Sequence, residues 1–245
     1  MDAKVIARGS GMAEFILVHG GQHGAWCWDL LRPELEELGH KTHAMDMPVD
    51  QAGVYIDGYV KAVGAAVAGK AADDAYLVGH SMGGLIVPRV AAERPRARII
   101  FLCAGFAHTS AEEQQENMAA IDGDLFSRSL VADSQGRVTM SRENATNAFY
   151  HDVPADIVDW AYGKLRPQWV EGYANVPPIA PYPERVAGIV ACSDDHIVLP
   201  EPHAKLARRR FGMEPRFLPG SHSPFLSRPA DLARVFDEIV RADRA

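Results

Sequence analysis

The 245-residue sequence has few cysteines, no excess of basic residues and no long apolar run. Its three cysteines, Cys27, Cys103 and Cys192, contain no Cys-x-x-Cys pair, so neither a disulfide framework nor a zinc site of that kind is predicted. They are typical of buried thiols in a reducing compartment, and we expect a cytoplasmic protein. The formal net charge of −7 argues against non-specific binding to nucleic acid.

The apolar residues, 47% of the chain, are enough for a sizeable core but are nowhere gathered into a membrane span. A spanning helix needs ~20 consecutive apolar residues, so we expect no membrane association. Residues 1–11 carry Lys4 and Arg8 without the apolar segment of a signal peptide. We interpret them as an N-terminal extension of the folded part.

Short apolar runs alternate with stretches of helical periodicity, which is the pattern of a parallel sheet with crossover helices. Strands are predicted over 15–18, 42–47, 75–78, 98–103, 186–191 and 215–218. Helices are predicted over 26–38, 55–67, 82–93, 201–211 and 230–242. The chain therefore has the α/β fold class, with a mainly parallel twisted sheet flanked by helices.

The segment from about 107 to 183 differs from the rest, because it is polar, helix-prone and rich in aromatic residues, without a strand-like run of Val or Ile. We predict one α/β domain, residues 12–106 and 184–245, interrupted by a mostly helical insertion over 107–183. Aromatic residues of this insertion are candidates for selecting a ligand. For Trp160, Tyr162 and Trp169 taken singly, packing of helices onto the sheet is the favoured interpretation.

The strongest local motif is Gly79-His80-Ser81-Met82-Gly83-Gly84, which follows one predicted strand and opens the next predicted helix. Glycines two residues before and after a serine allow a strained strand-to-helix turn that exposes the hydroxyl. The turn also places the Met82 N–H at a helix N-terminus, where it can stabilise an oxyanion. A glycine–serine turn without chemistry is the alternative. We predict that Ser81 is a nucleophile.

A second motif, His19-Gly20-Gly21, directly follows the first predicted strand. Small residues at this point let the loop pass close to a reacting carbonyl, and the Gly21 N–H is a candidate second oxyanion donor. Alone the motif would indicate only a glycine-rich turn, but together with the serine turn it favours a functional role. His19 and His23 are four residues apart without an acidic third ligand, so a metal site is not expected.

A serine nucleophile needs a base, and the base needs an acid that orients it. His222 lies between the last predicted strand and helix, at the sheet edge where ligands of α/β proteins bind, and is the candidate base. The other histidines considered, His40, His43 and His203, lie within or beside regular elements, where structural roles suit them. Asp194 and Asp195 both follow the strand predicted over 186–191. Spacing alone does not decide between these two acids.

These motifs resemble the α/β-hydrolase superfamily, and within it the plant methyl esterase and hydroxynitrile lyase group with its bacterial esterase relatives. The resemblance implies a central parallel sheet with a helical cap over the active site. It is carried by Val18-His19-Gly20-Gly21, Trp26-Cys27-Trp28, the serine motif and His222-Ser223-Pro224. In that group the strand after the cap ends in Thr/Ser-x-Asp. Matched to Ser193-Asp194-Asp195, this pattern makes Asp195 the acid.

Hydroxynitrile lyases of the group have Thr after the first-strand His and Lys after the catalytic His, where this chain has Gly20 and Ser223. Without that cation a lyase is not expected. We predict a serine hydrolase that cleaves an ester of a small, largely apolar carboxylic acid, for example a methyl or aryl ester, through an acyl-enzyme, without cofactor or metal. A slow-turnover small-molecule receptor of this fold, or a lyase or carbon–carbon bond hydrolase using the same three residues, is the alternative. A homodimer is left open by analogy.

Overall fold

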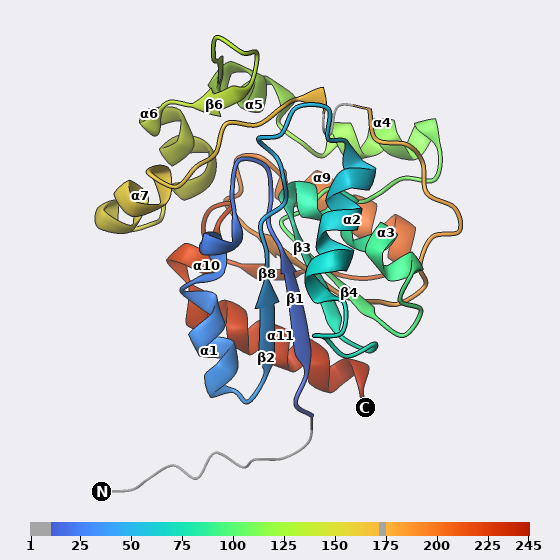
Figure 1. Ribbon diagram of the computed structural model, residues 1–245. Coiled ribbons are helices and arrows are strands. Elements are labelled where there is room, and N and C mark those ends of the chain that lie inside the picture. The colour runs from blue at the N-terminus through green and yellow to red at the C-terminus, as the bar shows by residue number, and fades with distance from the viewer. Residues whose placement is uncertain (1–10, 172–174) are drawn as a thin grey trace, which may run out of the picture.

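The computed structural model describes residues 11–171 and 175–245, so the predicted N-terminal extension over 1–11 lies outside the described residues except for Gly11. Its centre is a six-stranded sheet in the order β2-β1-β3-β4-β7-β8, in which all neighbouring strands are parallel (Figure 1). The predicted parallel sheet is therefore confirmed. The strands are β1 (Glu14–Val18), β2 (Lys41–Ala44), β3 (Tyr76–His80), β4 (Arg98–Leu102), β7 (Val186–Cys192) and β8 (Arg216–Leu218).

Helices cover both faces of the sheet. Alternate strand residues point to opposite faces, so Phe15 and Leu17 belong to one buried cluster and Ile16 and Val18 to the other. Because both faces are covered, the inner strands are largely apolar, whereas the edge strand β2 is mostly polar and only partly buried. The first cluster contains residues of α1 (Leu31–Glu37), α10 (Pro224–Ser227) and α11 (Pro229–Asp243). The second contains residues of α2 (Ile56–Val67), α3 (Val87–Ala92) and α9 (Pro200–Phe211).

Two helices predicted as continuous are interrupted, and proline explains both interruptions. The predicted helix over 26–38 becomes a 3-10 turn, η1 (Ala25–Trp28), followed by α1, and the one over 82–93 becomes η2 (Ser81–Leu85) followed by α3. Proline has no N–H and is tolerated only in the first turn of a helix. Pro33 and Pro88 lie in the first turns of α1 and α3, so neither helix can begin much earlier.

The segment between β4 and β7 lies over the carboxyl ends of the strands (Figure 1). Besides helices it contains a short antiparallel hairpin of β5 (Leu130–Ala132) and β6 (Val138–Met140), which the sequence did not indicate. Its turn is held by the Asp133 carboxylate, which accepts the N–H groups of Gln135 and Arg137. Strands of three residues are too short to show a periodic pattern. The helical elements are α4 (Ala111–Ala119), α5 (Gly123–Ser129), α6 (Arg142–Ala145), η3 (Thr146–Tyr150) and α7 (Ala155–Tyr162).

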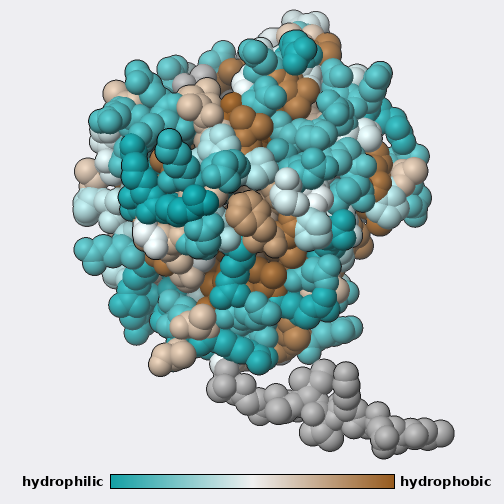
Figure 2. Space-filling model, turned by 180° about the vertical axis from the view of Figure 1, so that it is seen from behind, coloured by the Kyte–Doolittle hydropathy of each residue, from teal (hydrophilic) through white to brown (hydrophobic). Residues whose placement is uncertain are grey.

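The three cysteines are free and buried, as the sequence predicts. In the part of the chain that the structure describes, no helix has both the length and the apolar character needed to cross a bilayer. The face seen in Figure 2 is mostly hydrophilic, and its hydrophobic side chains form small separate areas. Homodimerisation and the boundaries of the insertion stay predictions.

Candidate active site

Ser81 stands at a strained turn between β3 and η2. Its φ of 52° lies in the left-handed region, which costs a non-glycine residue on the order of 1–3 kcal/mol. The flanking glycines leave room for the turn: a Cβ on Gly83 would lie 2.6 Å from the Val18 carbonyl oxygen, and one on Gly79 would lie 2.7 Å from the Gly83 oxygen. The sequence Gly79 to Gly83 thus dictates this sharp geometry, which is the one that exposes a serine hydroxyl.

The loop after β1 passes directly over this serine. A Cβ on Gly20 would lie 2.8 Å from the Ser81 Cβ, so only glycine permits the approach. The His19 ring holds the loop: its Nδ1–H donates to the Gly20 carbonyl (2.8 Å), and its Nε2 accepts the Met47 N–H (2.9 Å). Burial lowers the pKa of His19 to about 4, so its ring is neutral at pH 7. His19 is therefore a brace for the loop that carries Gly21.

His23 braces the same loop from the other side. Its Nδ1–H donates to the Gly21 carbonyl (2.8 Å) and its Nε2 accepts the Tyr150 hydroxyl (2.7 Å). Burial lowers the pKa of His23 to about 3, which keeps this ring neutral as well. Every ring nitrogen of His19 and His23 already has a hydrogen-bond partner, so the pair offers no free ligand atom to a metal.

His222 and Asp195 form a buried pair, each with a side chain that is 1% exposed. The His222 Nδ1–H donates to Asp195 Oδ2 (2.8 Å), and Asp195 Oδ1 accepts the N–H groups of Ile197 (2.8 Å) and Val198 (2.9 Å). This arrangement fixes the histidine tautomer and leaves Nε2 as the acceptor. Nε2 is buried and has no hydrogen-bond partner among the described residues. The Nε2 lone pair of His222 is thus left without a donor.

Asp194 and His80 lie close to this pair and make different contacts. The Asp194 side chain is 67% exposed and contacts His151 and His196. The structure thus brings Asp195 rather than Asp194 to His222. His80 donates its Nε2–H to the His222 carbonyl (3.0 Å), and its ring centroid lies 4.7 Å from that of His222. Burial, and then the nearby His222, lower the pKa of His80 well below its ordinary value, so it too is neutral.

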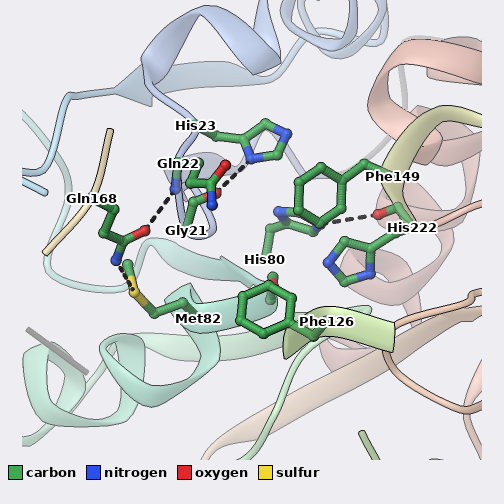
Figure 3. Close-up of a pocket in the computed structure, with 10 residues that line it drawn as sticks. Gly21, Gln22, His23, His80, Met82, Phe126, Phe149, Gln168 and His222 are labelled. Atoms are coloured by element: carbon green, nitrogen blue, oxygen red, sulfur yellow. Dashed lines mark hydrogen bonds between the residues drawn. The ribbon is translucent and has the colours of Figure 1, made fainter. Parts of the chain in front are cut away.

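A cavity of about 50 Å³ joins these groups (Figure 3). It contains the predicted nucleophile, the predicted base and both predicted oxyanion donors, whereas Asp195 lies behind His222. Gly79, Gly83, His19 and Gly20 shape the walls from outside. The lining residues are Gly21, Gln22, His23, His80, Ser81, Met82, Phe126, Phe149, Gln168 and His222.

Gln168 is the residue at this site that sequence reasoning missed. Its Oε1 accepts the Gln22 N–H (2.7 Å), and its Nε2–H donates to Met82 Sδ (3.2 Å), as Figure 3 shows. Gln168 is 1% exposed, and its backbone pairs with that of Val138 (2.7 and 2.9 Å). It thereby links the two segments that carry Gly21 and Met82. Gln168 belongs to no local motif and lies 146 residues from Gln22 in sequence, so no pattern could reveal it.

A second, larger cavity of about 310 Å³ meets the first at Ser81, Met82 and Phe126. Most of its wall is apolar. Its lining residues are Ser81, Met82, Leu85, Gly105, His108, Gln114, Asn117, Met118, Ile121, Gly123, Phe126, Val176, Ile197 and Val198.

Two of the aromatic residues of the predicted insertion line a cavity wall, and three others do not. Trp160, Tyr162 and Trp169 are absent from both cavity walls. Trp160 packs edge-on against Trp26 with a centroid distance of 5.4 Å, in agreement with a packing role. Phe126 and Phe149 are the aromatic residues of this segment that face the first cavity.

A model of the alpha/beta hydrolase family matches residues 15–235, which is most of the chain. The chain belongs to this family. Methyl jasmonate esterase 1 of Vitis vinifera is 26% identical over 258 residues, which cover 93% of this chain and 97% of that protein. The carbendazim hydrolyzing esterase of Nocardioides sp. (strain SG-4G) is 33% identical over 87 residues, 33% of this chain and 36% of that protein.

Among solved structures, polyneuridine aldehyde esterase superposes with a TM-score of 0.76 at 19% identity, over 94% of this chain and 99% of that one. This likeness confirms the α/β-hydrolase fold. The predicted relationship to the plant methyl esterase group and to bacterial esterases is confirmed as well. The chain is a carboxylic ester hydrolase.

Proposed function

We propose that the protein is a serine esterase in which Ser81 attacks the ester, His222 moves the proton and Asp195 orients His222. The observation that carries this proposal is the hydrogen bonding of His222. Its Nδ1 is bonded to Asp195 Oδ2 at 2.8 Å, while its Nε2 is buried, has no partner in the described part of the chain, and lies beside the cavity that Ser81 also lines. A base in this state gains a hydrogen bond when a serine hydroxyl or a leaving alcohol reaches it. The strained φ of Ser81 supports its role as nucleophile.

The reaction follows from these positions. His222 Nε2 takes the Ser81 hydroxyl proton as Oγ bonds to the ester carbonyl carbon, and the N–H groups of Gly21 and Met82 stabilise the resulting oxyanion. When the intermediate collapses, His222 gives the proton to the departing alcohol and leaves an acyl-Ser81. Water that is deprotonated by the same nitrogen then releases the acid. The three residues need no cofactor for these steps.

The two cavities assign the two halves of the ester. The alcohol must leave beside His222, which lines only the smaller cavity of about 50 Å³. One water molecule needs a cavity volume of roughly 10–15 Å³, so the space accepts a group of a few heavy atoms such as methanol. The acyl part then extends from Ser81 into the apolar cavity of about 310 Å³. We therefore favour methyl esters of compact apolar acids, an assignment that the name of the Vitis vinifera relative supports.

The segment over 107–183 acts as a cap in this proposal. It supplies Phe126 and Phe149 to the wall of the smaller cavity, and Gln168 to the support of the oxyanion donors. Apolar walls exclude water from the reacting carbonyl and strengthen the interactions of Gly21 and Met82 with the oxyanion. The side chains that this segment contributes to the cavity wall thus decide which esters fit.

Steady-state hydrolysis of the methyl and benzyl esters of phenylacetic acid tests the proposal. Methanol and benzyl alcohol are similar leaving groups, so a difference in kcat/KM reports the space beside His222. We expect the methyl ester to be preferred by roughly tenfold or more. Phe149→Ala enlarges that space and should reduce the preference, whereas Ser81→Ala should remove turnover of both esters. Preference for the benzyl ester would contradict the assignment of the two cavities, and a single slow turnover would indicate a receptor.

A further inference from the structure

We propose that His151, Asp194 and His196 form a binding site for one divalent transition-metal ion such as Zn²⁺, outside the catalytic cavity. His151 follows η3 in the segment over the sheet, and the other two residues lie on the loop between β7 and α9. The three side chains come together although 43 residues separate His151 from Asp194. Spacing along the chain therefore could not predict the site, and neither cavity lining includes these residues.

The ligand atoms are spaced as a metal would require. His151 Nε2 lies 3.1 Å from Asp194 Oδ2, and His196 Nε2 lies 3.7 Å from Asp194 Oδ1. One ligand atom from each residue lies within 4.8 Å of the others. Around tetrahedral Zn²⁺ with bonds of roughly 2.0–2.1 Å, neighbouring ligand atoms are roughly 3.3 Å apart. The two distances to Asp194 are close to this value, and a bound ion would draw the two histidine nitrogens, which lie within 4.8 Å of one another, closer together.

The hydrogen bonding of His196 suits a metal ligand. Its Nδ1 lies 2.8 Å from the Asn147 carbonyl oxygen, so Nδ1 must carry the hydrogen. Nε2, which faces the Asp194 carboxylate, is then the ring nitrogen that can bind a metal. A carbonyl that holds Nδ1–H is also the usual outer partner of a metal-bound histidine. The His151–Asp194 contact alone would be a simple hydrogen bond.

The two imidazole rings stack on one another, with centroids 4.0 Å apart and 18° between their planes. The in-plane lone pairs of parallel rings do not converge, so the rings must turn out of this stack before both donate to one ion. Two nitrogens and one carboxylate suit Zn²⁺, Co²⁺ or Ni²⁺ better than Ca²⁺ or Mg²⁺, which prefer oxygen alone. The Asp194 side chain is 67% exposed, which leaves water access to the remaining coordination position.

The bound ion would have a structural role. It would tie the turn after η3 to the loop that begins at Ser193 and carries Asp195. None of the three ligands contacts the ester in the proposed reaction, so the ion takes no part in catalysis. Its effect belongs instead to the stability of the contact between the two segments.

Titration of the EDTA-treated, dialysed protein with Co²⁺ and Zn²⁺ tests the site. We expect one ion per chain, visible d–d absorption of a low-symmetry Co²⁺ site, displacement of Co²⁺ by Zn²⁺, and a higher Tm with Zn²⁺. Loss of an outer partner alone weakens metal binding roughly 10–100-fold, so His151→Ala and His196→Ala should each raise Kd at least roughly tenfold. The control His43→Ala removes a partly buried histidine on β2, beside Glu14, and should leave Kd unchanged.

The same variants also define the results that would overturn the proposal. If wild type and the double variant His151→Ala/His196→Ala bind Co²⁺ equally weakly, the cluster is only a hydrogen-bonded group and the proposal is wrong. Binding that survives in the double variant with the same d–d spectrum would place the ion elsewhere and would overturn it too. Because an alanine variant can lose fold, His196→Gln is measured in parallel, and its Tm without metal must equal that of wild type.

Discussion

Two residues, Asp195 and His80, orient His222 through hydrogen bonds to its ring and to its backbone carbonyl. Asp195 accepts its Nδ1–H at 2.8 Å, and His80 donates to its backbone carbonyl at 3.0 Å. Both contacts are buried, so water cannot replace either one when it is lost. The orientation of the proposed base therefore depends on these two buried side chains.

Asp195→Asn should abolish most activity at unchanged fold. An amide at this position can donate to Nδ1 and would favour the wrong histidine tautomer, which costs about 10⁴-fold in kcat in the Ser-His-Asp enzymes that define the effect. Asp194→Asn, assayed with EDTA present, should cause a far smaller loss, because its side chain is 67% exposed and does not contact His222. The measurement is kcat for both variants, and equal losses would refute the assignment of the acid.

For single residues, the sequence predicts the position of a site residue where neighbouring residues in the chain determine it. The Ser81 turn follows from its glycines, and the position of His222 follows from its place after the last strand. The choice between Asp194 and Asp195 did not follow from spacing, because adjacent side chains point in different directions. The loop decides it: Asp195 Oδ1 accepts two backbone N–H groups of the following turn, which directs Asp195 inward. The family pattern supplied the choice that spacing could not.

Secondary-structure elements were predictable where burial is uniform. The inner strands are largely apolar because helices cover both faces, and the predicted strand positions are correct to within a few residues. Helix starts were less predictable, since periodicity continued through Pro33 and Pro88, whose missing N–H groups delay α1 and α3. The hairpin of β5 and β6 was not predicted from the sequence, because each of its strands has only three residues.

Gln168→Leu tests the connection between two such elements. Leucine keeps the approximate volume but leaves the buried Gln22 N–H without an acceptor, which costs about 1–3 kcal/mol of stability. The loop that carries Gly21 should then shift, and kcat should fall roughly tenfold to a hundredfold with little change in KM. Met82→Leu, which removes only the Sδ contact, serves as the control and should lose much less. Unchanged kcat in Gln168→Leu would show that the loop positions itself.

At the scale of the whole molecule, several buried histidines make stability depend on pH. Burial lowers the pKa of His19 and His203 to about 4 and that of His23 to about 3, whereas in the unfolded chain they regain ordinary values near 6.5. Below that pH the unfolded state binds more protons than the folded state. Stability is therefore full above about pH 6.5 and falls as pH decreases toward the folded pKa values.

The free energy of unfolding in urea should thus be lower at pH 5 than at pH 7. Each of these histidines contributes up to about 1.4 kcal/mol per pH unit within that window. His203→Gln cannot titrate at this position, so its stability should decline less steeply with falling pH. Equal unfolding free energies of the wild type at pH 7 and pH 5 would contradict the neutral, buried state of these rings.

The arrangement of the sheet could be predicted as a whole, but the cavities could not. Their walls combine core residues such as Ser81 and His222 with residues of the segment over the sheet, such as Phe126, Phe149 and Gln168. Contacts of that kind depend on how two distant segments pack, and no local pattern encodes them. The proposed placement of the alcohol in the smaller cavity and the acyl part in the larger one therefore depends on the structure.

The most direct test of the central claim is mass spectrometry of the acid-quenched reaction with p-nitrophenyl butyrate, followed by peptide mapping. The account predicts that a butyryl group appears during turnover on the peptide that contains Ser81, disappears when substrate is exhausted, and is absent in Ser81→Ala. Steady turnover with no acylated peptide, or with the butyryl group on another residue, would contradict it.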